Sequence, residues 1–109
     1  MTRKSIIPDQ IIFTQMIGLL IGYAVLLGYG LTFADAYAKS GHREGSFHYK
    51  RLAVDFNLFF WDIDKQKWIY QRSTEAHEKL GIFWESIGGT WGGRFRRKDG
   101  NHYSKGESR

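Results

Sequence analysis

The chain has 109 residues, of which 42% are apolar and 25% are charged, as in an ordinary soluble domain with one core. It contains no cysteine, which excludes disulfides and thiolate zinc sites. The net charge of +5 favours polyanionic surroundings such as nucleic acid, anionic lipid or the bacterial wall. We expect one domain over residues 1–109, with a core over about 10–104 and a frayed tail at the C-terminus.

The N-terminal segment is apolar over residues 11–31, long enough to span a membrane, and Arg3 and Lys4 precede it. Residues 36–38 also imitate a signal-peptidase site, so an exported or anchored form is one alternative. Against it, apolar residues recur at helical spacing. They are Phe13, Met16, Ile17, Leu20, Ala24 and Leu27. This pattern favours a helix buried in a core from about Pro8 to Leu27, ended by Gly28, without stable membrane insertion.

The remaining chain indicates short strands and one further helix. We expect a strand over 31–37, a loop over 39–45, and a central strand over 52–61 that a turn joins to a hairpin arm over 67–71. A helix capped by Ser73 or Thr74 follows and ends at Gly88. Its apolar stripe consists of Leu80, Phe83, Trp84 and Ile87. With a last strand near His102, this predicts an α+β domain with a mostly antiparallel sheet flanked by helices.

Two short clusters carry the candidate chemistry. His48 and Asp55 lie seven positions apart, so they converge only if His48 precedes the strand that holds Asp55. Asp99 and His102 are three apart, which one turn of chain can bring together. Two imidazoles and a carboxylate are ligands that suit a catalytic zinc ion with an open position. We therefore predict one zinc ion per chain held by His48, Asp55 and His102, with Asp99 as the catalytic base.

Each of these residues also has a structural interpretation. Asp99 can begin a turn with Gly100, and single histidines are more often hydrogen-bonded than metal-bound. Asp55 is the hardest to explain in this way, because a buried unpaired carboxylate is unfavourable. His42 and His77 lack acidic neighbours at ligand spacing, and His77 is expected on a solvated helix face.

The segment Ser46-Phe-His-Tyr-Lys-Arg-Leu-Ala-Val-Asp55 resembles the Ser-x-His-x-x-Gly-x-Ala-x-Asp signature of zinc peptidases that cut peptidoglycan peptides. That family includes D-alanyl-D-alanine carboxypeptidases and phage L-alanyl-D-glutamate endopeptidases. Residues 91–95, followed by Asp99-Gly-Asn-His-Tyr103, resemble its second signature, and residues 80–88 resemble an intervening helix of phage members. The resemblance spans residues 10–104 and implies a small Hedgehog/D,D-peptidase-like fold with the zinc and base roles given above.

Two positions depart from the family pattern. Arg51 stands where the first signature has glycine, and Ala38-Lys39 stands where an arginine usually binds a substrate carboxylate. Lys39 can supply a point charge but not the bidentate fork of arginine. We expect Lys39 and Arg51 to be substrate-binding residues.

The residues and the family resemblance together predict a phage or prophage endolysin that hydrolyses bacterial peptidoglycan peptides. We expect it to stay in the host cytoplasm until lysis and then to act on the cell wall. One alternative is a D,D-carboxypeptidase anchored in the membrane through residues 11–31. Another is a basic nucleic-acid-binding or phage structural protein with a degenerate site, for which the cationic run Arg94–Lys98 is the support. No specific nucleic acid is expected for the peptidase, and the sequence leaves its oligomeric state open.

Overall fold

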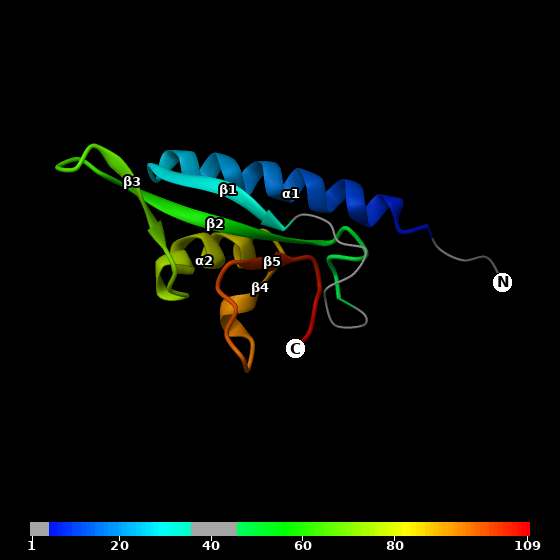
Figure 1. The fold of residues 1–109 in the computed structure, drawn as a ribbon. Helices are drawn as coiled ribbons and strands as arrows, with labels where there is room; N and C mark the ends of the chain where they lie inside the picture. The colour runs from blue at the N-terminus through cyan, green and yellow to red at the C-terminus, as the bar shows by residue number, and fades with distance from the viewer. Residues whose placement is uncertain (1–4, 36–45) are drawn as a thin grey trace.

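The fold consists of two helices and an antiparallel sheet (Figure 1), seen in a computed structural model that describes residues 5–35 and 46–109. The helices are α1 (Ile7–Leu26) and α2 (Glu78–Ser86), and each of the 3₁₀ turns η1 (Glu75–His77) and η2 (Gly92–Arg94) spans three residues. The strands are β1 (Tyr29–Asp35), β2 (Ala53–Asp62), β3 (Lys67–Gln71), β4 (Thr90–Trp91) and β5 (His102–Ser104). The predicted α+β class with an antiparallel sheet is confirmed.

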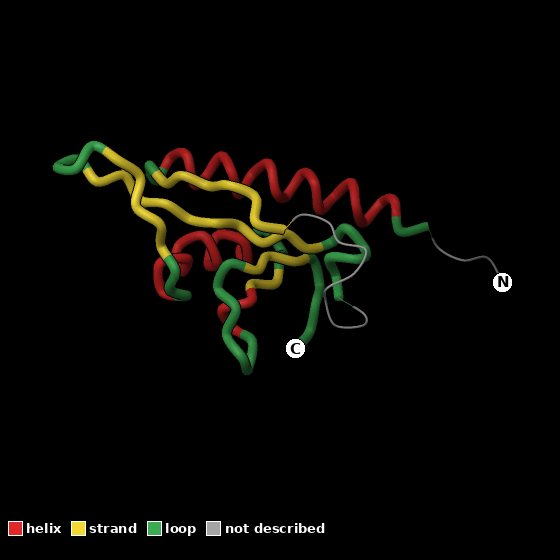
Figure 2. Tube along the Cα trace, viewed as in Figure 1, coloured by secondary structure: helices red, strands yellow, loops and turns green. Residues whose placement is uncertain are grey.

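Strand β2 organises the sheet, whose order is β1-β2-β5-β4. Along its other edge β2 pairs first with β5, through residues 53–55, and then with β3, through residues 58–62. The β2–β3 hairpin projects beyond the helices (Figure 2). Its turn is held by the Asp62 carboxylate, which accepts hydrogen bonds from the backbone N–H groups of Asp64 and Lys65.

The core lies on one face of β2, because successive side chains of a strand point to opposite faces. Val54, Phe56 and Leu58 are buried on that face, where both helices pack. Phe13 of α1 meets Trp84 of α2 edge-to-face, with ring centroids 5.9 Å apart. Asp55 therefore points to the face of the sheet that the core does not occupy, which leaves it available for a site.

Helix α1 begins and ends one residue before its predicted bounds, and it is buried on only one side. Its core-facing side chains are Phe13, Met16, Leu20 and Ala24. The opposite side is also apolar and stays exposed, with Leu19 at 57% and Leu26 at 86% exposure. The helix is long and apolar enough to cross a membrane by length and composition, and 22% of its most apolar window is buried. The prediction of a buried helix was thus wrong for this exposed side.

The other predicted elements are largely confirmed. The strands appear within two residues of their expected starts, Ser73 caps the η1–α2 segment through a bond to the Ala76 N–H, and Gly88 (φ 98°) follows α2. The expected loop over 39–45 lies outside the described residues. Strand β4 was not predicted. The expected C-terminal tail over 105–109 lies after β5, and Glu107 within it is 7% exposed.

Adjacent leucines test whether α1 belongs to the folded domain. We expect Leu20→Ala to lower the free energy of unfolding by about 2–5 kcal/mol, because this fully buried side chain would leave a cavity. Leu19→Ala, on the exposed side, should change it by less than about 0.5 kcal/mol. Urea denaturation of both variants measures the difference. Equal effects would mean that α1 does not pack in this way.

Candidate metal centre

The site begins with the pairing of β2 and β5, in which Asp55 and His102 are direct cross-strand partners. Directly opposed residues of an antiparallel pair point to the same face, with their Cβ atoms close together. The Asp55 Oδ1 atom lies 3.0 Å from His102 Nδ1. Sheet register therefore brings together two residues that are 47 positions apart in the sequence.

His48 joins them from the turn that precedes β2, as the odd spacing to Asp55 required. Backbone hydrogen bonds from Arg51 N–H to His48 O and from Leu52 N–H to Phe47 O close this turn. The Ser46 hydroxyl accepts a hydrogen bond from the His48 N–H, which gives the serine of the signature a structural role. His48 Nε2 then lies 3.3 Å from Asp55 Oδ1.

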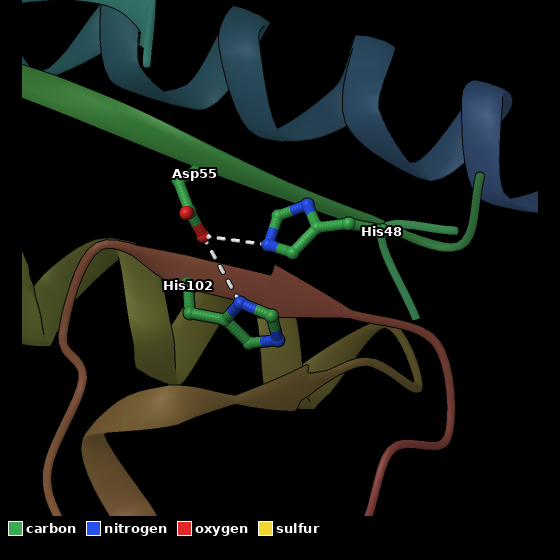
Figure 3. Close-up of side chains that lie close together, drawn as sticks. All are labelled: His48, Asp55 and His102. Atoms are coloured by element: carbon green, nitrogen blue, oxygen red, sulfur yellow. Dashed lines mark hydrogen bonds and ion pairs between the residues drawn. The ribbon is translucent and has the colours of Figure 1, made fainter. Parts of the chain in front are cut away.

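His48, Asp55 and His102 each direct one possible ligand atom to a common point (Figure 3). These atoms lie within 4.8 Å of one another, and both imidazoles are almost fully buried. Burial alone would raise the pKa of Asp55, but hydrogen bonds from His102 and His48 and their charges lower it to about 2. Burial would lower the pKa of His48, yet the hydrogen bond and charge of Asp55 raise it. Two imidazole nitrogens and an ionised carboxylate form a donor set that fits zinc.

Asp99 is held beside this cluster by a turn built on Trp91 and Gly92. The Asp99 N–H donates to Gly92 O, and a side chain at Gly92 would lie 2.1 Å from Asp99 O. The Trp91 indole N–H donates to Gly100 O, and the His102 N–H donates to Asp99 O. Burial and the charge of Asp55 raise the pKa of Asp99, against the opposing charges of His102, Arg109 and His48. The raised pKa makes Asp99 a stronger base than an exposed carboxylate.

The two predicted substrate-binding residues have different outcomes. Lys39 lies outside the described residues. Arg51 is exposed and adopts a left-handed conformation, with φ of 57°. Glycine adopts such a φ without steric penalty, which explains why the signature has glycine at this position. A role for Arg51 in substrate binding stays a prediction.

Sequence reasoning missed two polar residues that support the site. His77 was expected on a solvated face but is 2% exposed, and its Nδ1 atom lies 2.8 Å from the Tyr103 hydroxyl. Tyr103 follows His102 in β5 and points into the core, so this hydrogen bond joins β5 to η1 on the core side of the sheet. Glu107 contacts His102 directly. The sequence gives no local signal for the first pairing, because His77 and Tyr103 belong to segments that only the fold brings together. Glu107 follows His102 closely in the sequence but was expected in the tail.

In a comparison with protein families, residues 39–105 match the model described as D-alanyl-D-alanine carboxypeptidase. The chain belongs to this family of zinc peptidases. The matched residues contain both signatures and the whole His48, Asp55 and His102 cluster. Comparison with curated proteins gives no match. The family explains why this peptidase concentrates buried histidine and carboxylate groups on one face of a small sheet.

The pKa of His77 predicts how stability depends on pH. Burial lowers this pKa to about 4, whereas an unfolded histidine titrates near 6.5. As pH falls below 6.5 the unfolded chain takes up a proton before the folded chain does, so stability is lost between pH 6.5 and 4. We expect a loss of up to about 3 kcal/mol from this residue.

The variant His77→Gln isolates this contribution, because glutamine can bond to the Tyr103 hydroxyl without titrating in this range. Unfolding free energies of both proteins should be measured in the presence of a chelator at pH 4 and pH 6.5. The difference between the two pH values should be smaller in the variant. The same difference in both proteins would show that His77 does not titrate as a buried group.

Proposed function

We propose that this protein is a zinc-dependent peptidase that hydrolyses peptide bonds in bacterial peptidoglycan, in its stem or cross-bridge peptides. The observation that carries the proposal is the convergence of His48, Asp55 and His102 at one point of a chain from the zinc peptidase family. These three residues would hold the ion through two nitrogens and one carboxylate oxygen. When bound, zinc lowers the pKa of water and polarises a carbonyl group, which is the chemistry that amide hydrolysis needs.

The proposed role of Asp99 is general base and then general acid. Its half-buried carboxylate would accept the proton of the attacking water and return it to the nitrogen of the leaving amine. Burial and the neighbouring ionised Asp55 raise the pKa of Asp99 and so suit it to both transfers. The turn that fixes Asp99 between Gly92 and Gly100 would hold its carboxylate in place during them.

A cationic cavity beside Asp99 supports an anionic substrate. The cavity encloses about 880 Å³. Its lining consists of Phe95, Arg96, Arg97, Lys98, Asp99 and Arg109. Four positive side chains around the base would attract peptides that carry free carboxylates, and anionic wall polymers more generally.

If these charges bind the wall, binding of the protein to purified cell walls should weaken at high salt, because salt screens exposed charges. A pull-down assay with purified walls measures this binding. Binding that salt does not change would remove this part of the proposal.

The finer proposal is a phage or prophage endolysin that waits in the host cytoplasm and reaches the wall when the membrane is opened. It is supported by the resemblance of residues 80–88 to a helix of phage members and by the packing of α1 in the domain core. Wall lysis from outside, after detergent permeabilisation of test cells, would agree with it.

A membrane-anchored carboxypeptidase is the second candidate, and the exposed apolar side of α1 favours it. This candidate has a structural difficulty. If α1 entered a bilayer, Phe13, Met16, Leu20 and Ala24 would leave the core shared with α2 and β2. Flotation of the full chain with vesicles distinguishes the candidates, because a spanning helix floats with the lipid even at high salt.

The site residues can be tested by separating zinc binding from hydrolysis. We expect Asp99→Asn to keep one zinc ion per chain but to lower peptidoglycan hydrolysis by about 10²–10⁴-fold, because the amide cannot accept the proton. Asp55→Ala should lose zinc and activity together. Elemental analysis and release of peptides from purified peptidoglycan provide the two measurements.

Asp64→Asn is the matched control, since Asp64 lies in the exposed β2–β3 turn and should leave both quantities unchanged. A parent protein that is folded and binds no zinc, even when zinc is supplied, would refute the peptidase and favour the nucleic-acid-binding alternative.

A further inference from the structure

Glu107 is a buried carboxylate that follows the last strand. The Lys105 N–H donates to Leu52 O, and Gly106 then adopts a φ of 85°, which a glycine tolerates best. The chain thereby turns back toward β5, and the Glu107 side chain reaches His102 with only 6% of its surface exposed. A charged group at this depth requires partners, because burying an unpaired carboxylate is strongly unfavourable.

Both oxygens of Glu107 have such partners. Oε1 lies 3.1 Å from His102 Nε2, and Oε2 contacts the Nε atom of Arg109. The Arg109 guanidinium also lies over the Phe95 ring, 4.9 Å from its centroid, and the Phe95 ring is 5.6 Å from the His102 ring. Arg109 therefore contacts Glu107, and Phe95 lies against both Arg109 and the His102 ring.

His102 thus has a carboxylate at each ring nitrogen. Asp55 faces Nδ1, whereas Nε2 points away from Asp55 (Figure 3) and meets Glu107. A neutral imidazole carries one N–H, and the nitrogen that binds a metal must carry none. A carboxylate that accepts the Nε2–H leaves the lone pair of Nδ1 directed toward His48 and Asp55. It also fixes the rotation of the ring and increases the basicity of the ligand nitrogen.

We propose that Glu107 is a positioning residue of the metal centre, which holds His102 in the tautomer and orientation that present Nδ1 to the ion, and that Arg109 holds Glu107 in place. The inference rests on the proposed function, because it assigns Glu107 a part in zinc binding. Glu107 lies beyond the residues that the family model matches, so the proposal depends on these contacts alone.

The test compares the zinc affinities of three variants with that of the parent, by competition with a chromophoric chelator. We expect Glu107→Ala to weaken zinc binding by about 10–100-fold. Glu107→Gln should weaken it less, because the amide oxygen can still accept the Nε2–H but lacks the charge. Glu85→Ala is the matched control, since Glu85 also pairs with an arginine, Arg94, at 3.1 Å but has no ion pair with a histidine among the described residues; the zinc affinity of this variant should equal that of the parent.

A second readout separates positioning from simple support of the fold. In the zinc-loaded parent, ¹⁵N NMR should show His102 protonated at Nε2, with the proton protected from exchange. In Glu107→Ala that protection should be lost, whereas Glu85→Ala should keep it.

The outcomes distinguish this inference from the proposed function. If the parent binds no zinc, the proposed function fails and the positioning role fails with it. If the parent binds zinc and a folded Glu107→Ala binds it equally tightly, only the role of Glu107 is overturned. Should Glu107→Ala not fold, an unchanged affinity in Glu107→Gln, together with unchanged exchange of the Nε2 proton, would overturn it instead.

Discussion

The pairing of Asp55 with His102 across β2 and β5 is the contact on which the site depends. It fixes a carboxylate and an imidazole on the same face of the sheet, and the turn before β2 then adds His48. On the other face, Phe56 and Tyr103 pack against the helices. A slip of one residue in this register would exchange the two faces and bury the polar groups in the core. The apolar packing of the sheet therefore enforces the geometry of the polar cluster.

Much of the site could be predicted from the sequence because its signals are local. The two signatures contain His48, Asp55 and His102, and the odd spacing of His48 and Asp55 predicted that His48 lies before the strand that holds Asp55. His77 and Glu107 could not be found in this way. His77 pairs with Tyr103, a residue of a distant segment that only the fold brings close. Glu107 is near His102 in the sequence, but it becomes buried only because the chain turns at Gly106 after β5. Strand β4 has two residues, too few for a periodic pattern.

Helix α1 shows a different limit of sequence reasoning. Its apolar periodicity correctly identified the side that packs, including Leu20 and Ala24. Periodicity cannot show whether the remaining apolar residues are covered, because that depends on how many elements the chain supplies to pack around a helix. This chain has one other α-helix and one sheet among its described residues, and they cover a single side of α1.

The loop over residues 93–98 is closed by hydrogen bonds between its two ends, so its length and sequence can change while its ends stay in place. The two ends of the loop are joined to each other by two hydrogen bonds, from the Asp99 N–H to Gly92 O and from the Trp91 indole N–H to Gly100 O. Loop closure depends only weakly on the number of residues between fixed ends. Insertions or charge reversals here would alter which molecules approach while Asp99 keeps its place. Under the proposed function, the fold therefore separates the loop that would meet the substrate from the turn that holds the proposed base, and evolution or engineering could exchange the first without rebuilding the second.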